Sequence, residues 1–283
     1  MTRKSLGTAV RVVLLVALIG VAWWLREASI PTKVQGAAMV LCALLVADLG
    51  FKVTRRLVPF EVLRRHGAAQ TAIFAIVGTV YGLIAAFVVI VVWEDFSSTD
   101  ATVAREANAL ADLERMSAGF AVVERRQVQG AARSYAYQVI HEEWPAMAEG
   151  RSSERAQAAL IELWHVYTDM GPAERAHPLY DHSIDRLTEM DDNRRLRLAA
   201  GSERVPAIMW GMLYAGGSSV VILAYLFESP RDWFQRFIIA LLAGTIMFSI
   251  FLVVALEGPF DGDVSVNPAP FQYVLDHMQT LEE

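Results

Sequence analysis

Three long stretches without a charged side chain constrain the fold of this chain more than any other feature. They run over Thr71–Trp93, Val205–Phe227 and Phe237–Leu256. A helix needs roughly 20 apolar residues to cross a bilayer core about 30 Å thick, and all three stretches reach that length. Within lipid, backbone polar groups must find hydrogen-bond partners inside their own segment. The sequence therefore predicts three membrane-spanning helices and an all-α fold.

Two earlier apolar segments give weaker signals. Val34–Phe51 is uncharged until Asp48, and Thr8–Leu25 is uncharged apart from Arg11 and ends just after two tryptophans. Tryptophan rings prefer the interface between lipid and water. The residues that follow lack the small side chains of a signal-peptide cleavage site. We interpret residues 8–25 as a retained signal anchor, with a secretory signal as the alternative, and expect four or five spans.

Basic side chains between the second and third predicted spans set the expected orientation. Against a single acid, Glu61, this short loop carries Lys52, Arg55, Arg56, Arg64 and Arg65. Short loops rich in Lys and Arg stay in the cytoplasm, whereas long loops cross the membrane largely regardless of charge. We therefore expect a cytoplasmic N-terminus, with residues 94–204 and the tail after Leu256 outside the cytoplasm.

Residues 94–204 are predicted to form a helical domain. Apolar side chains recur there at helical spacing, as at Val103, Ala107 and Leu110. Ser152 or Ser153 can cap one helix, and Pro172 can open a last one. We expect this last helix to continue into the fourth span, and the run that ends at Trp93 to continue into the domain as one helix.

The chain is thus predicted to have five parts. They are an extra span or signal anchor (1–33), the second and third spans (34–93), a helical domain (94–204), the fourth and fifth spans (205–257) and a Pro/Gly-rich tail (258–283). The net charge of −6 lies mostly in the loops and gives no sign of nucleic-acid binding. The single cysteine, Cys42, excludes a disulfide framework. Ion pairs at helical spacing are expected between Asp48 and Lys52 and between Asp191 and Arg195.

Four sequence segments carry a resemblance to a known family. They are Trp93-Glu94, "REANAL" at Arg105–Leu110, "EEWPAM" at Glu142–Met147 and "GPFDGDVSVNPAPF" at Gly258–Phe271. With the order of spans, they make the chain from about residue 34 onward resemble the bacterial bestrophin-like domain family. The resemblance implies a pentameric ion channel of the bacterial inner membrane. It also implies a pore helix with an apolar neck that runs into a helical extramembrane domain.

Two features depart from the bestrophin pattern. The bestrophin domain is cytoplasmic, whereas the charge distribution here places residues 94–204 outside. In addition, no run of five acids resembles the bestrophin calcium clasp. The analogy with a channel therefore rests on the fold.

The third span would take the place of the pore helix. Gly78, Gly82 and Ala86 are four residues apart, and small residues at this spacing form close-packed helix seams. The alternative is an apolar constriction that gates by dewetting. Its pore-lining candidates are Gly78, Tyr81, Gly82, Ala85 and Val89. Glu94 and Asp95 either form a ring at the pore mouth, where they would attract cations, or begin a solvated helix.

The tail offers one candidate cation site. Asp261 and Asp263 flank a glycine, and two such carboxylates can bind Ca²⁺ together with backbone carbonyls. The alternative is a simple turn that leads the tail back onto the helical domain. In that case Phe260 and Phe271 would anchor the tail as an extended plug. The histidines lack the spacing of a metal site on one helix face.

We therefore predict a homo-oligomeric channel, with a pentamer favoured, that conducts small inorganic ions across the lipid bilayer. The alternative is a membrane-anchored sensor or scaffold whose helical domain binds a ligand or partner. No catalytic motif is present, so an enzyme is not expected. No cofactor is expected other than the candidate Ca²⁺.

Overall fold

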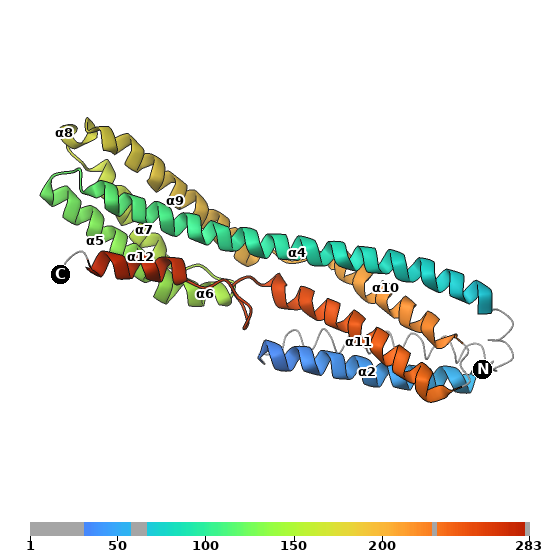
Figure 1. The fold of residues 1–283 in the computed structure, drawn as a ribbon. Helices are drawn as coiled ribbons and strands as arrows, with labels where there is room; N and C mark the ends of the chain where they lie inside the picture. The colour runs from blue at the N-terminus through green and yellow to red at the C-terminus, as the bar shows by residue number, and fades with distance from the viewer. Residues whose placement is uncertain (1–30, 58–66, 228–230, 281–283) are drawn as a thin grey trace. The chain divides into compact units, whose positions relative to one another are not determined.

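The computed structural model describes residues 31–57, 67–227 and 231–280, and this part of the chain contains helices and no strand (Figure 1). The all-α prediction is confirmed. Four of the described helices are long and apolar enough to cross a membrane. They contain the second to fifth predicted spans. The predicted first segment, residues 8–25, lies outside the described residues.

The chain divides into two compact units. The span unit comprises the described residues up to Trp93 together with those of Val205–Glu257, and the second unit comprises Glu94–Arg204 together with the described residues from Gly258 onward. Helix α4 (Gly67–Ser117) contributes to both units because it runs without interruption past Trp93. The expected continuation of the third span as one long helix is therefore confirmed. The placement of the second unit outside the cytoplasm stays a prediction.

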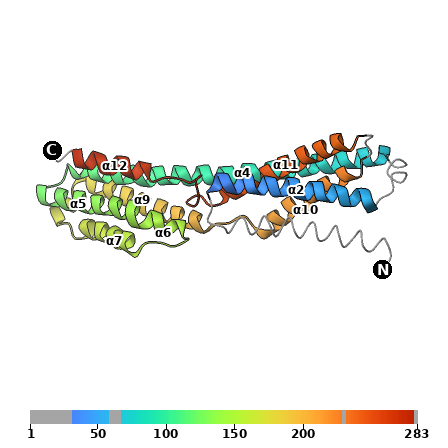
Figure 2. The ribbon, with the colours of Figure 1, turned by 90° about the horizontal axis from the view of Figure 1, so that it is seen from below.

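The span unit is a bundle of apolar helices. It is built by α2 (Thr32–Leu57), the first half of α4, α10 (Ala207–Tyr225) and α11 (Asp232–Glu257). Helices α2 and α11 lie side by side in both views (Figures 1 and 2). A Cβ atom on Gly36 of α2 would lie only 2.6 Å from the Phe251 ring of α11. The absence of a side chain at Gly36 therefore allows these two helices to pack closely.

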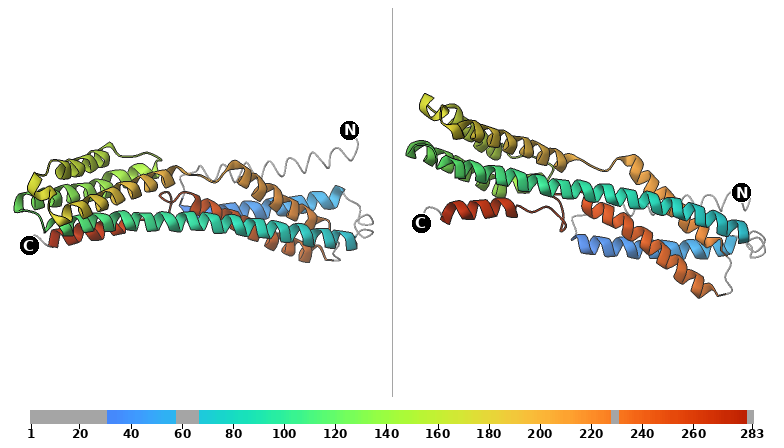
Figure 3. Two further views of the ribbon diagram at one scale, coloured as in Figure 1. Left: turned by 90° about the horizontal axis from the view of Figure 1, so that it is seen from above. Right: turned by 45° about the horizontal axis from the view of Figure 1, so that its top comes forward.

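The second unit is a layered helical domain (Figure 3). Besides the second half of α4, its elements are α5 (Val122–Gln138), the π-helix η1 (Val139–Glu143), α6 (Trp144–Ala148), α7 (Glu154–Thr168), α8 (Pro172–Arg175), α9 (Pro178–Ser202) and α12 (Ala269–Thr280). Val103, Leu110 and Leu163 are among its fully buried core residues. The predicted Ser153 cap is confirmed, since its hydroxyl accepts a hydrogen bond from the Ala156 N–H at 3.3 Å.

The prediction of one helix from Pro172 into the fourth span is wrong. Helix α8 ends at Arg175, and His177 caps α9 by accepting a hydrogen bond from the Leu179 N–H at 3.2 Å. Helix α9 ends at Ser202, and α10 begins only at Ala207. Proline disfavours helical backbone in the residue before it and has no N–H to donate, so Pro206 accounts for the break.

The tail is less extended than predicted. Phe260 and Phe271 are both buried, as expected of anchors. From Ala269 onward, however, the chain forms helix α12 rather than an extended plug. The Asn267 side chain accepts a hydrogen bond from the Ala269 N–H at 2.9 Å, which caps the start of this helix.

Candidate functional site

The span half of α4 has one face buried by its own chain. Tyr81, Ala85, Val88 and Val92 recur every three or four residues and are at most 7% exposed. The Tyr81 ring packs against α10, where a Cβ on Gly216 would come within 2.6 Å of it. This face therefore joins α4 to the rest of the span unit.

The five predicted pore-lining residues differ in how far the protomer itself covers them. Tyr81 and Ala85 belong to the buried face. Gly82 is exposed, and Gly78 and Val89 are half-buried. A Cβ on Gly78 or Gly82 would meet nothing within 4 Å. Tyr81 and Ala85 are thus covered by the protomer itself, and a pore-lining role for the other three stays a prediction.

The face of α4 opposite the buried one carries large apolar side chains. Ile76, Leu83 and Ile90 are seven residues apart and are 65%, 57% and 50% exposed. Seven residues make nearly two helical turns, so the three side chains lie in one line along the helix. Sequence reasoning missed this line because almost the whole run is apolar, and such a run has little periodicity to single out a face.

Glu94 and Asp95 follow this apolar line along the same helix. Both are exposed, and neither forms an ion pair with any described residue. Glu94 comes four residues after Ile90, about one helical turn, and therefore lies close to the same line. Their role at a pore mouth stays a prediction.

Asp261 and Asp263 lie in a tight turn of the tail. Gly262 between them has a φ of +75°, a conformation that glycine adopts at little cost. The Val266 N–H donates to the Pro259 carbonyl at 2.7 Å and closes the loop. Among the described residues, no three His, Cys, Asp or Glu side chains are grouped as metal ligands. Two exposed carboxylates alone fall short of the six to eight oxygens that Ca²⁺ takes, so Ca²⁺ binding here stays a prediction.

A buried cluster of charges, which sequence reasoning missed, lies in the core of the second unit. Glu106 of α4, Glu143 of η1 and Arg197 of α9 are fully buried. Arg197 Nε donates to one Glu106 oxygen at 2.6 Å, and its Nη2 donates to the other at 2.9 Å and to Glu143 at 2.7 Å. Arg194 forms two further hydrogen bonds to Glu143, at 3.2 and 2.6 Å. The cluster thus pairs two carboxylates with two guanidiniums.

The buried surroundings shift the pKa values of the cluster. Burial, and then the charge of Glu106, raise the pKa of the Tyr135 hydroxyl well above its ordinary value. Burial alone would raise the pKa of Glu143, but Arg197 and Arg194 lower it below its ordinary value. Burial alone would lower the pKa of Arg197, but Glu106 and Glu143 raise it. Glu143 and Arg197 are therefore held in their charged forms.

The cluster is also in contact with the tail. The Arg197 guanidinium lies 5.3 Å from the Trp144 ring centroid and 5.8 Å from that of Phe271. Trp144 Nε1 donates a hydrogen bond to the Val266 carbonyl at 3.2 Å. Three of the four segments that carried the family resemblance therefore meet at Arg197, which contacts "REANAL" through Glu106, "EEWPAM" through Glu143 and Trp144, and the tail through Phe271.

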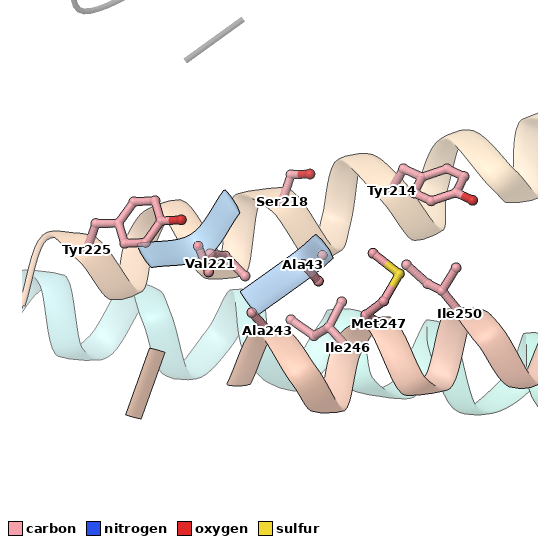
Figure 4. A pocket seen from close by; sticks show the side chains of 11 residues that line it. Ala43, Tyr214, Ser218, Val221, Tyr225, Ala243, Ile246, Met247 and Ile250 are labelled. Atoms are coloured by element: carbon pink, nitrogen blue, oxygen red, sulfur yellow. The ribbon is translucent and has the colours of Figure 1, made fainter. Parts of the chain in front are cut away.

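A pocket lies in the span unit between α2, α10 and α11 (Figure 4). Its lining includes Ala43 of α2, Ser218 of α10 and Met247 of α11, and none of its lining residues is charged. An inorganic ion in this pocket would lose its hydration without gaining a charged partner. This pocket thus offers an ion no charged ligand.

Solved structures with a similar fold exist despite low sequence identity. A point mutant of a bacterial bestrophin homologue from Klebsiella pneumoniae is 12% identical, with a TM-score of 0.63, and the match covers 86% of this chain and 98% of that one. A second mutant from the same organism is 14% identical, with a TM-score of 0.62, and the match covers 86% and 97%. A structure described as a membrane protein is 13% identical, with a TM-score of 0.64 and coverage of 86% and 96%.

The sequence itself assigns the family. No curated protein matches the chain. The bestrophin-like domain family matches it over residues 41–271, which is most of its length and includes three of the four described spans and most of the first. The chain therefore belongs to the bestrophin-like domain family.

Proposed function

We propose that this protein is a homo-oligomeric ion channel, with five copies favoured, whose pore is lined by one α4 helix from each copy. Family membership supports the channel, and the exposed apolar line on α4 supports the position of the pore. A helix that is bound to its own chain on one side can turn only the other side toward a symmetry axis. On α4 that side carries Ile76, Leu83 and Ile90.

The constriction would work by dewetting. A narrow ring of apolar side chains expels water and so blocks ions until the ring widens. Glu94 and Asp95 would follow at one mouth and raise the local concentration of cations. Gly82 and Ala86, on the flank of the line, would let α4 helices of neighbouring copies approach one another. The protein acts as a conduit and not as an enzyme.

The oligomer and the conductance are tested on the same sample. Native mass spectrometry of the purified protein should give a single assembly, with a ring of five favoured, and planar bilayers should show conductance. A monomer or dimer would have too few α4 helices to enclose a pore. A closed ring with no conductance under any ionic condition would instead favour the membrane-anchored sensor or scaffold.

A polar substitution tests the position of the constriction. Leu83→Ser should raise the conductance or the open probability, because a hydroxyl favours wetting of the neck. Leu45→Ser is the matched control, because Leu45 is 62% exposed on α2 and Leu83 is 57% exposed on α4. If both variants have the same conductance and open probability as the unaltered protein, Leu83 does not line the pore.

A further inference from the structure

Four basic side chains gather at one end of the span unit, where the described residues hold fewer carboxylates than cations. We call this group the basic seam, which consists of Lys52, Arg55 and Arg56 at the end of α2 and Arg236 near the start of α11. Asp48 binds both Lys52, at 2.7 Å, and Arg236, at 2.6 Å. The predicted pair of Asp48 and Lys52 is thus confirmed, but one carboxylate is shared by two cations. Counted together, the four cations of the seam and Asp48 have a net charge of +3.

Arg55 is the fixed element of the seam. Its guanidinium donates to the side-chain oxygen of Gln235 and to the Phe227 carbonyl, and it lies 5.1 Å from the Phe51 ring centroid. All these partners are neutral, and Arg55 forms no ion pair with a carboxylate of the described chain. The guanidinium is therefore held in position, and no carboxylate of the described chain pairs with it.

Exposed aromatic residues indicate the depth of the basic seam. Trp233 and Phe237 of α11 flank Arg236 in the sequence and are 64% and 60% exposed. Exposed Trp is enriched where a span meets the lipid headgroups. Lys52 and Arg56 come at the end of the apolar part of α2, where its hydrophobic run stops. The seam is thus at the level at which lipid phosphates lie.

We propose that the basic seam binds the phosphate group of an anionic phospholipid. Charged side chains bind phosphate oxygens through charge-assisted hydrogen bonds. The exposed Lys52 and Arg56 can donate these bonds, and the fixed guanidinium of Arg55 adds its positive charge. Free inorganic phosphate has the same chemistry, but at this depth the phosphate is supplied by the membrane. The inference needs the spans to cross a membrane and does not depend on ion conduction.

The test measures headgroup preference on the whole protein. Delipidated protein in a neutral detergent is titrated with phosphatidylglycerol and with phosphatidylcholine, and bound lipid is counted by native mass spectrometry. We expect tighter binding of phosphatidylglycerol, weakened about fivefold for each cation removed in Arg55→Gln or Arg56→Gln. Lys33→Gln is the control, because it removes the same charge from an exposed site at the other end of α2.

The outcomes separate the sources of phosphate and exclude a folding effect. Arg56 is exposed, so Arg56→Gln tests the site without disturbing the bonds that Arg55 makes. If the phospholipid stays bound in millimolar inorganic phosphate, the result supports a lipid as the ligand of the site. If inorganic phosphate displaces the phospholipid, the proposal is overturned. Equal binding of the two lipids, or an equal loss in Lys33→Gln, also overturns the proposal. The preference for phosphatidylglycerol can be measured even if the protein shows no conductance, so failure of the proposed channel and failure of the lipid site are distinguishable.

Discussion

Removal of Arg197 should be the most damaging single substitution in the second unit. Its guanidinium is 0% exposed and bonds to two carboxylates, Glu106 and Glu143, that are also 0% exposed. In Arg197→Met, Glu143 keeps Arg194 as a partner, but Glu106 keeps only the Tyr135 hydroxyl, at 2.6 Å. The substitution therefore leaves an uncompensated charge in the core.

The size of the effect follows from that charge. Breaking a buried ion pair by removing one partner costs about 3–5 kcal/mol. The lost contacts with the Trp144 and Phe271 rings add to this cost. A loss of about 1 kcal/mol lowers the Tm of a unit of this size by roughly 3 °C. We expect Arg197→Met to lower the Tm by about 10–15 °C.

The assay is thermal unfolding of the full chain in detergent, which is monitored by circular dichroism and by tryptophan fluorescence. Trp144 lies beside Arg197, so its emission should change in the same transition. Arg195→Met is the matched control, because Arg195 is 63% exposed and pairs with Asp191 at 3.3 Å on the surface, as predicted. Exposed pairs contribute about 0–1 kcal/mol. Equal Tm values for the two variants would refute the stabilising role of the cluster.

Two further predictions test the pH dependence and the helix packing. The pKa of Glu143 is lowered on folding, so its stabilisation is complete above the ordinary value of 4.5 and is lost as the pH falls below it. The Tm should therefore fall more steeply on acidification in the unaltered protein than in Glu143→Gln. Gly216→Ala should destabilise the span unit by about 1–3 kcal/mol, because the added Cβ would clash with the Tyr81 ring. Gly211→Ala on the same helix is the control and should not destabilise the unit, because a Cβ there meets nothing within 4 Å. Thermal melts of both glycine variants decide this, and equal melts would mean that the ring moves aside without cost.

The spans and the long α4 helix could be predicted from the sequence because membrane insertion imposes a length and a composition on each segment. The break before α10 was predictable in principle from Pro206, but the preceding run of charged residues has good helix propensity and concealed it. The cluster at Arg197 could not be predicted. Its members come from α4, η1 and α9, and charges spaced along a helix usually form a solvated face.

The π-helix is a local reason why the cluster at Arg197 could not be predicted. Helix η1 has a wider turn than an α-helix, which rotates the side chains after it relative to an α-helical count. Glu142 and Glu143 follow one another, and only the geometry of the chain decides that Glu143 enters the core while Glu142 forms an exposed pair with Arg155 at 2.6 Å. Sequence spacing alone treats the two acids as equivalent.

The outward face of α4 was not predictable from the sequence for a different reason, and that reason bears on assembly. In the second half of α4, the side chains that a helical pattern predicts to be buried are covered by the same chain, as at Val103 and Leu110. In the first half nearly every residue is apolar, so the chain covers only one face and leaves Ile76 and Leu83 exposed. Those side chains can face lipid, neighbouring copies or an axis. One helix thus has its surroundings set by its own chain in the second half and largely by what surrounds the protomer in the first half. Helical periodicity therefore predicted the buried residues of the domain but not the face that α4 turns outward.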